Sequence, residues 1–378
     1  MRYAMIMAGG AGTRLWPVSR KGTPKQLVPI IERGDRRVSL LELSAKRLEG
    51  LVPSERRYIC TNEAYRDQIK AALPEFTDEL ILGEPEGRDT VNAVGFAAAV
   101  LHARDPDAVF AVLTADHIIE PADLFRDRIE TGFELVEADP TRLVTFSIEP
   151  TYPATGFGYV ERAAKIDGFD GLAYSVERFV EKPSLEKAQA YLESGGFGWN
   201  SGMFVWSAAN FMDCLRRYKP ESHEGLARIG AAWDTPDRVK VLHEVYPALP
   251  KISVDYAVME PATREQARVA GKPDAAKSVK VCTVRMDLSW LDVGSWPSYG
   301  ETLDADEQGN RVSGEATLHD CSASLVVNAR SGGKPHRVAV LGAENLIVVH
   351  TDDATLVMPA EKAQDLKALH ATLADELK

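Results

Sequence analysis

The sequence predicts an α/β protein with a mostly parallel sheet, followed by a small β-rich domain that ends in a helix. Through the first half, short apolar runs rich in β-branched residues alternate with longer stretches of helical periodicity, which is the rhythm of βα units. From about Gly309 the chain changes to short apolar runs separated by turn residues. At 378 residues it is long enough for two domains, which we place at residues 1–305 and 306–378.

The expected βα elements start at the N-terminus. Ser39–Glu42 has the capping-box pattern that opens a helix, which we expect to run to about Leu48. Each expected strand leads into a segment with Gly, Pro, Asp or His, and in open α/β sheets such loops form the binding crevice. The expected strands are Arg2–Ala8, Tyr58–Cys60, Glu79–Leu82, Ala108–Leu113 and Leu143–Ser147.

The C-terminal domain is predicted from four short apolar runs and a final helix-compatible stretch, Ala360–Leu377. Short, evenly spaced strands are compatible with a small β-helix. We expect this domain to serve assembly or stability more than the chemical step. The apolar runs are Ser324–Val327, Val338–Leu341, Leu346–Val349 and Thr355–Val357.

Composition argues against several classes of protein. The net charge of -12 and the pI near 5.3 would repel a phosphate backbone, so we expect no nucleic-acid partner. No run approaches the roughly 18–20 apolar residues that span a bilayer, and the N-terminus lacks a secretion signal. The four cysteines contain no C-x-x-C pair, so neither a zinc site nor a disulfide framework is indicated. We therefore expect a cytoplasmic protein with no membrane partner.

The strongest chemical signal is the glycine-rich stretch after the first expected strand. Backbone N–H groups from Ala8 to Thr13, including those of Gly9, Gly10 and Gly12, can form a cradle for phosphates. Arg14 and Lys25 add fixed positive charge, which a ligand-free strand-to-helix turn would not require. The spacing fits neither the Walker loop nor the dinucleotide fingerprint, which weakens a nicotinamide dehydrogenase as an alternative. The stretch therefore predicts a triphosphate-binding loop.

This stretch resembles the signature of the sugar-1-phosphate nucleotidyltransferases, G-G-x-G-[ST]-R-L-x-P-x-[ST] with a following P-K, and fills every position. Within that family the Leu15–Ser19 form of the loop is most similar to the mannose-1-phosphate guanylyltransferases. The resemblance extends over almost the whole chain. It implies a Rossmann-like sheet of the nucleotidyltransferase type and a magnesium-assisted reaction of GTP with mannose 1-phosphate. It also gives Arg14 and Lys25 a catalytic role at the triphosphate.

The segment after the third expected strand is a candidate for reading the base. A carboxylate such as Glu84 can accept hydrogen bonds from both N1–H and N2–H₂ of guanine, a pair of donors that adenine and uracil do not present. Arg88 and Thr90 follow in the same segment, and we assign them to the nucleotide as well. The alternative is a capped helix start with solvated charges.

Two carboxylates are candidates for the metal. Asp116 ends an expected strand, where it could cap a turn or reach a metal on the triphosphate. The resemblance implies that Asp116 and the distant Asp292 bind Mg²⁺ together, which agrees with the one or two carboxylates that Mg²⁺ usually takes. His117 has either a structural role or a supporting role behind the ligands.

The middle of the chain should supply the sugar side of the site. Gly156 and Tyr159 lie in a segment similar to the family's T-G-[YF]-G-Y, where small residues let a hexose lie against the backbone. Glu181 offers a carboxylate for sugar hydroxyls, Lys182 an ammonium for the 1-phosphate, and Asn200 a further hydroxyl partner. Taken alone, Glu181 and Lys182 would be a solvated strand end.

Three alternatives stay open on the sequence. One is a transferase for another nucleotide or sugar, such as UTP or dTTP with glucose 1-phosphate, and Glu84 is the residue that argues against it. Another is a non-catalytic subunit that binds nucleotide sugars, although such a protein need not retain both metal carboxylates. A nicotinamide enzyme is the third. The exposed short strands after Gly309 make a homodimer the expected assembly.

Overall fold

The computed structural model describes residues 1–10, 12–272, 278–330, 332 and 336–378. Its contacts divide the chain into two compact units. The first contains residues 1–9, 45–114 and 119–290, and the second contains residues 10–44, 115–118 and 291–378. The predicted boundary at 305/306 falls inside the second unit, and the two-domain division stays a prediction.

The first unit is built on a nine-stranded sheet. Its buried centre follows from strands such as β1, whose four inner residues are all buried. The strands β5, β4, β1 and β6 run parallel to one another, as do β8 and β12. The strands β11, β10 and β9 pair antiparallel with their neighbours. In spatial order the strands are β5 (Ile81–Glu84), β4 (Arg57–Asn62), β1 (Arg2–Met7), β6 (Val109–Thr114), β11 (Phe197–Ser207), β8 (Arg142–Ile148), β12 (Lys280–Met286), β10 (Ala173–Glu181) and β9 (Gly158–Lys165).

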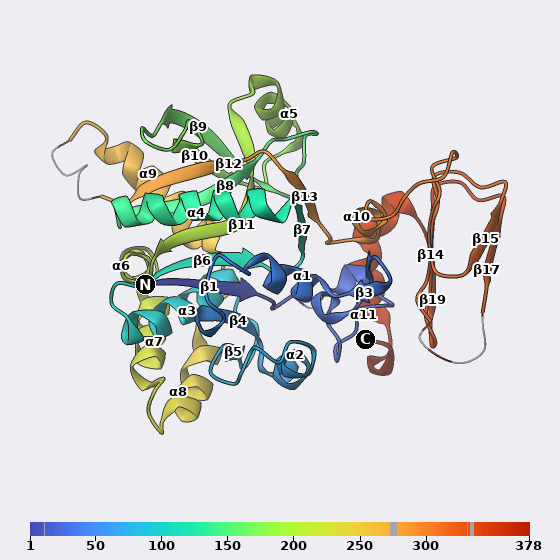
Figure 1. Ribbon diagram of the computed structural model, residues 1–378, viewed down its shortest axis with the longest axis horizontal. Helices are drawn as coiled ribbons and strands as arrows, with labels where there is room; N and C mark the ends of the chain where they lie inside the picture. The colour runs from blue at the N-terminus through green and yellow to red at the C-terminus, as the bar shows by residue number, and fades with distance from the viewer. Residues whose placement is uncertain (11, 273–277, 331, 333–335) are drawn as a thin grey trace. The chain divides into compact units, whose positions relative to one another are not determined.

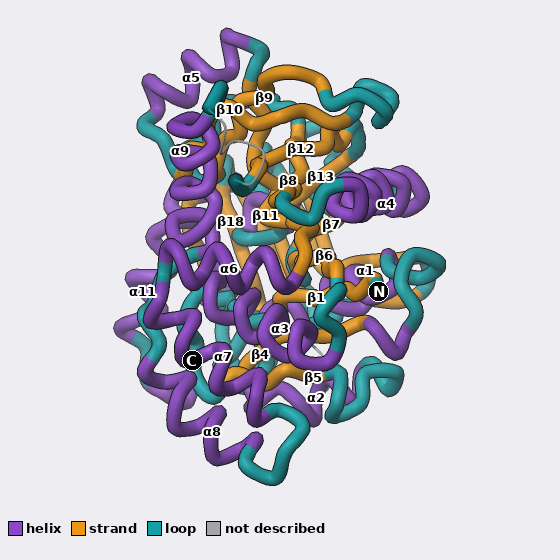
Figure 2. Tube along the Cα trace, turned by 90° about the vertical axis from the view of Figure 1, so that its left-hand side faces the viewer, coloured by secondary structure: helices purple, strands orange, loops and turns teal. Residues whose placement is uncertain are grey.

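Helices cover both faces of this sheet, with α4 on one side and α6 and α9 on the other (Figure 2). Helix α3 is apolar all round and packs against β1, β4 and β5 as well as α6 and α7, which explains its burial from Val91 to Leu101. A π-helical turn, Asp255–Met259, leads into α9. The helices are α2 (Arg66–Ala72), α3 (Thr90–Arg104), α4 (Ala122–Ala138), α5 (Leu185–Ser194), α6 (Ala208–Tyr218), α7 (Pro220–Ala232), α8 (Arg238–Val245) and α9 (Glu260–Val269).

The second unit contains the β-rich C-terminal part, drawn in orange and red in Figure 1. Parallel strands stack in register, with Val312 beside Val326 and Val326 beside Val348, as successive coils of a β-helix would. β19 closes this ladder antiparallel, and β15 pairs with β17 in a second parallel ladder. The strands are β14 (Arg311–Ser313), β15 (Ala316–His319), β16 (Leu325–Asn328), β17 (Val338–Leu341), β18 (Leu346–His350) and β19 (Thr355–Pro359).

Short helical pieces complete this unit. The predicted terminal helix is divided into a 3₁₀ segment, Ala360–Asp365, the helix α11 (Leu366–Thr372) and a last turn, Asp375–Leu377. It breaks at Leu373, whose backbone is extended. The other elements are α10 (Trp296–Gly300), the hairpin β2 (Ile31–Arg33) and β3 (Arg36–Val38), and α1 (Leu40–Arg47), which leads into the first unit. Two further short strands are β7 (His117–Glu120) and β13 (Ser289–Asp292).

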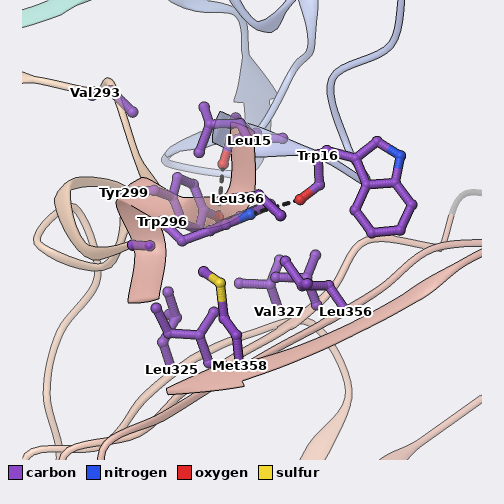
Figure 3. Close-up of a cluster of buried hydrophobic side chains, with 14 of the residues drawn as sticks. Leu15, Trp16, Val293, Trp296, Tyr299, Leu325, Val327, Leu356, Met358 and Leu366 are labelled. Atoms are coloured by element: carbon purple, nitrogen blue, oxygen red, sulfur yellow. Dashed lines mark hydrogen bonds between the residues drawn. The ribbon is translucent and has the colours of Figure 1, made fainter. Parts of the chain in front are cut away.

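One apolar cluster forms the core of the second unit (Figure 3). Leu15 and Trp16 from the glycine-rich loop lie in it with Trp296, Leu356 and Leu366 from the C-terminal third of the chain. The indole Nε1–H of Trp296 donates to the carbonyl of Trp16 at 2.9 Å. The loop is therefore built into the same core as the β-helix strands.

The predicted fold class is confirmed: an α/β sheet precedes a β-helix-like part with a terminal helix. The sheet is more mixed than the βα rhythm of the first half indicates, because β11 enters between the parallel strands β6 and β8 in the opposite direction. No described helix is both long enough and apolar enough to cross a membrane.

Candidate active site

The glycine-rich loop starts where β1 ends, and two of its glycines lie too close to neighbouring atoms to carry a larger side chain without displacement. A Cβ at Gly9 would lie 3.2 Å from Glu84 Oε2, so the backbone passes close to that carboxylate. Gly12 has φ +64°, and a Cβ there would lie 2.8 Å from the Cβ of Lys25. Gly10 has open space around it. A side chain is therefore excluded at Gly12 by both conformation and contact, and the loop is held against Lys25.

Lys25 is buried and lies at the centre of a polar group in the second unit. Its Nζ donates to Asp116 Oδ2 at 2.9 Å and to the carbonyl of Val293 at 3.1 Å. The Val293 N–H in turn donates to the carbonyl of Asp116 at 3.1 Å. Burial raises the pKa of Asp116, but the charges of Lys25 and His117 outweigh it and hold the pKa well below its usual range. The carboxylate is therefore ionised and can serve as a ligand for a cation.

Asp116, His117 and Asp292 form a group whose potential ligand atoms all lie within 4.8 Å of one another. Asp116 Oδ1 lies 3.7 Å from Nε2 of the buried His117. Two carboxylates with room for waters and phosphate oxygens fit the ligand preference of Mg²⁺. The ammonium of Lys25 pairs with one oxygen of Asp116, Oδ2, which leaves Oδ1 for another partner. The structure thus brings the two predicted ligands together and adds His117.

Arg14 lies near Asp292 of this group, with Gly294 between them. A Cβ at Gly294 would lie 3.2 Å from Asp292 Oδ1 and 3.5 Å from Arg14 Nη2, so this glycine keeps the space between them free. Arg14 is exposed, and its Nη1 donates to Gln364 Oε1 at 3.1 Å. Thr13 opens the 3₁₀ turn that carries Arg14. Both predicted catalytic residues therefore belong to the unit that holds the candidate metal ligands.

Glu84 lies in the first unit at the end of β5, where its carboxylate is buried. Burial raises its pKa, and the hydroxyl of Tyr246, which donates to Glu84 Oε1 at 2.6 Å, opposes that rise. A buried carboxylate that retains acceptor capacity suits a ligand edge with two donors. Tyr246 was not predicted from the sequence.

Arg88 and Thr90 have other partners within the first unit. The guanidinium of Arg88 pairs with Glu86, and Thr90 Oγ1 accepts from the N–H of Val254 at 2.9 Å. Their contribution to nucleotide binding stays a prediction, as does that of Ala8.

The predicted sugar-side residues divide into a connected group and two separate positions. Asn200 Oδ1 accepts from Thr145 Oγ1 at 2.8 Å, which directs its Nδ2 to Asp255 Oδ1 at 3.0 Å. Glu181, buried in its side chain, accepts from Lys182 Nζ at 2.7 Å. Burial, reinforced by the charge of Glu181, raises the pKa of Asp255 to about 7. Two carboxylates, an amide and an ammonium thus lie together in the first unit.

Tyr159 lies opposite Val180 and Trp199, the chain neighbours of Glu181 and Asn200, and Gly156 precedes it by three positions. A Cβ placed on Gly156 would have no atom within 4 Å, so the surroundings of this residue are open. Tyr159 is fully buried, and its hydroxyl donates to the carbonyl of Ala154 at 2.9 Å. The Tyr159 side chain therefore supports the segment from within, and substrate contact by either residue stays a prediction.

Comparison with known proteins shows the family to which this chain belongs. Residues 3–309 match the nucleotidyl transferase family, and residues 322–373 match the mannose phosphate isomerase/GMP-like β-helix domain. Mannose-1-phosphate guanylyltransferases of Klebsiella pneumoniae and Escherichia coli are each 38% identical over 372 residues, which cover 97% of this chain and 73% of theirs. The chain belongs to the mannose-1-phosphate guanylyltransferase family.

A solved structure agrees with this membership. The crystal structure described as mannose-1-phosphate geranyltransferase from Thermus thermophilus has a TM-score of 0.79 and 32% identity, and covers 97% of this chain and 98% of its own. The likeness extends over both units of the chain. As a member of the mannose-1-phosphate guanylyltransferase family, the protein is an enzyme that transfers nucleotidyl groups.

Proposed function

We propose that the protein transfers the guanylyl group of GTP to mannose 1-phosphate and releases pyrophosphate. The observation that carries this proposal is the 38% identity to enzymes of that name over 97% of the chain. Each cluster of polar side chains described above has the chemistry that one part of these two substrates requires.

Glu84 is the residue proposed to select guanine. Its buried carboxylate would accept hydrogen bonds from N1–H and N2–H₂, while Tyr246 continues to donate to Oε1. A base without that pair of donors would leave a buried charge poorly solvated, which is costly. Glu84 therefore supports GTP over UTP, dTTP or ATP.

The loop and the second unit are proposed to hold the triphosphate. Arg14 and Lys25 would bind its oxygens, together with N–H groups of the glycine-rich loop. Asp116 and Asp292 would hold Mg²⁺, with His117 beside them. When bound, this ion neutralises phosphate oxygens and stabilises the charge that grows on the leaving group. Lys25 lies within hydrogen-bonding distance of Asp116. With GTP and Mg²⁺ bound, its ammonium would either keep this bond beside the metal or turn to the phosphates.

The sugar 1-phosphate is proposed to meet the group around Glu181. Glu181, Asn200 and Asp255 present acceptors and donors for sugar hydroxyls, and Lys182 supplies positive charge for the 1-phosphate. Asp255 joins the residues predicted from sequence because it is the partner of Asn200.

The reaction is an in-line displacement at the α-phosphorus of GTP. A bond forms from a phosphate oxygen of mannose 1-phosphate to the α-phosphorus, and the bond to the bridging oxygen of the β-phosphate breaks. The electron pair leaves with pyrophosphate. Because the nucleophile is already an anion, the side chains need only bring two polyanions together and stabilise the leaving charge.

The test is pyrophosphate release from mannose 1-phosphate and Mg²⁺ with GTP, ATP, UTP or dTTP in separate reactions. The proposal expects release with GTP and little with the others. Release with another nucleotide alone would remove the assigned role of Glu84, and no release with any of the four would contradict the proposed substrates. Glucose 1-phosphate in place of mannose 1-phosphate controls for the sugar.

We further propose that the enzyme is a cytoplasmic homodimer. The four described cysteines are unpaired and buried, which agrees with a reducing compartment. Leu341 on β17 and Val357 on β19 are exposed apolar residues in the β-helix-like part, which agrees with a protein contact there. Light scattering coupled to gel filtration would test the assembly, and a monomeric mass at working concentration would contradict it.

A further inference from the structure

From Gly10 onward, the glycine-rich loop belongs to the same compact unit as the C-terminal segment, Ala360–Lys378. In the core of that unit, Leu15 and Trp16 of the loop pack with Ala363 and Leu366 of the segment, as Figure 3 shows for Leu15, Trp16 and Leu366. The likeness to nucleotidyltransferases accounts for a nucleotide-binding loop at this place in the sequence. It does not account for the packing of residues 360–378 against that loop.

Hydrogen bonds connect the two segments beyond this apolar contact. Trp16 Nε1 donates to the carbonyl of Leu377 at 2.7 Å, and Arg20 Nη1 donates to the same carbonyl. The N–H of Lys21 donates to the carbonyl of Lys378 at 2.5 Å. The guanidinium of Arg20 also lies over the Trp16 ring, 5.5 Å from its centroid. The C-terminal backbone thus supplies acceptors to three positions of the loop's second half.

One further bond reaches Arg14, in the part of the loop proposed to bind the triphosphate. Gln364 Oε1 accepts from Arg14 Nη1 at 3.1 Å. Arginine has five N–H donors in a fixed planar arrangement, so a bond to one of them orients the remaining four. Gln364 is neutral, so it orients the guanidinium without competing with phosphate for its charge.

The loop has little regular secondary structure that could hold Arg14 and Trp16 in place. Its 3₁₀ turn, Thr13–Leu15, has three residues, and its N-cap, Gly12, offers no side chain to cap it. A short turn with a glycine cap is held mainly by its tertiary contacts. The C-terminal segment provides such contacts on both sides of Pro17.

We propose that the segment Ala360–Lys378 positions the glycine-rich loop for GTP, with Gln364 orienting the Arg14 guanidinium and the Leu377 carbonyl anchoring Trp16. This inference rests on the proposed function, because it assigns the loop to GTP. It gives this segment a part in nucleotide binding, where the sequence suggested a role in assembly or stability more than in the chemical step. Gln364 is a positioning residue because it acts through Arg14.

The test is a double-mutant cycle on GTP binding in the full chain. Calorimetry with GTP and Mg²⁺, without sugar phosphate, gives the Kd for the wild type, Gln364→Met, Arg14→Met and the double variant. Methionine keeps the length of Gln364 but removes its acceptor. Since Gln364 is exposed, this change should leave the melting temperature within a few degrees of the wild type. We expect Gln364→Met to raise the Kd about 5- to 10-fold, the usual effect of losing one hydrogen bond.

The coupling between the two substitutions decides the matter. If Gln364 acts through Arg14, Gln364→Met should change the Kd less than about twofold once Arg14 is methionine. Lys362→Met is the matched control, because Lys362 lies in the same segment but pairs with Asp365 and should leave the Kd unchanged. Trp16→Phe, which removes the donor to Leu377 and keeps an aromatic ring, should also raise the Kd.

Three results would overturn the proposal. A Kd unchanged by Gln364→Met in a wild type that binds GTP would remove Gln364 from nucleotide binding and leave the proposed function intact. An equal increase in both backgrounds would show an effect that does not pass through Arg14. A wild type that neither binds GTP nor releases pyrophosphate from it would instead overturn the proposed function and this inference together.

Discussion

Replacing Gly158 with alanine would displace the carboxylate proposed to bind the sugar. A Cβ at Gly158 would lie 2.4 Å from Glu181 Oε2 and 3.3 Å from Asn200 Cβ. Ordinary van der Waals contact begins at 3.4 Å, so Oε2 must move by about 1 Å (3.4 − 2.4). The Glu181 side chain is only 7% exposed and is bonded to Lys182 Nζ at 2.7 Å, so the ammonium must move with it.

The expected loss follows from that displacement. A misplacement of about 1 Å in a positioning group can reduce the rate roughly 100-fold, which is about 2.7 kcal/mol at the transition state. We therefore expect kcat/KM for mannose 1-phosphate to fall by about two orders of magnitude. The KM for GTP should change less than about twofold, because Glu84 lies in a different group of side chains.

The assay is steady-state pyrophosphate release with each substrate varied in turn, beside a thermal melt of each variant. Gly196→Ala is the matched control, since a Cβ there has only Ser194 Oγ nearby, at 3.9 Å. The control should behave as the wild type does. A Gly158→Ala enzyme with wild-type kcat/KM for mannose 1-phosphate would refute the reasoning, because the Glu181 carboxylate would then be dispensable where it lies.

Three other changes have equally specific outcomes. Tyr246→Phe removes the hydroxyl that donates to Glu84 at 2.6 Å, so the pKa of Glu84 should rise. The KM for GTP should increase about 10-fold in steady-state kinetics. An unaltered KM would contradict the assignment of Glu84 to guanine. Asp292→Asn should weaken Mn²⁺ binding, followed by electron paramagnetic resonance, by about 10-fold or more, and an unchanged titration would remove Asp292 from the metal site. Asp255→Asn tests the raised pKa of Asp255, about 7 against an ordinary 3.8. Because the fold favours the protonated acid, the wild type should lose stability as pH rises from about 4 to about 7, and the amide variant should escape that loss. After allowance for partial exposure, urea unfolding should show the variant gaining about 1–2 kcal/mol on the wild type between pH 5 and pH 8, and an equal difference at both pH values would contradict the shift.

The parts of the site that sequence could predict are those that depend on local structure. A glycine stretch after a buried strand predicts the loop, and a carboxylate at the end of a strand predicts Asp116 and Glu84, because the position on the strand already fixes where the side chain lies. Asp292 has no such local signal, and only the resemblance to a family connected it with Asp116. The structure brings the two together in one group.

The residues that sequence missed are partners of the predicted ones. Tyr246 and Glu84 are 162 positions apart, and Asp255 and Asn200 are 55 apart, so no periodicity links them. Their residue types are also common at solvated or structural positions. The residues around Asp255 have the pattern of an amphipathic helix, which indicates a structural role for this segment.

Local sequence patterns could not predict the full order of strands in the sheet either. The parallel strands β1, β4, β5 and β6 follow from the βα rhythm, because each connection carries a helix that returns the chain to the edge at which the previous strand began. The position of β11 between β6 and β8 depends on which neighbour offers free backbone groups once the other strands have paired. A register such as Phe204 beside Val112 is therefore a property of the assembled sheet.

The packing of the loop with the end of the chain also bears on how the enzyme is made. Arg14 and Gln364 are 350 positions apart, so a ribosome has finished the loop long before it adds the residues that hold it. Until then Leu15 and Trp16 lack Leu366 and Ala363, their neighbours in the core. A nascent or prematurely terminated chain would expose an unfinished apolar surface beside its phosphate-binding loop. Catalytic competence would therefore require that residues 360–378 have been synthesised, which makes activity itself a check that this segment is intact.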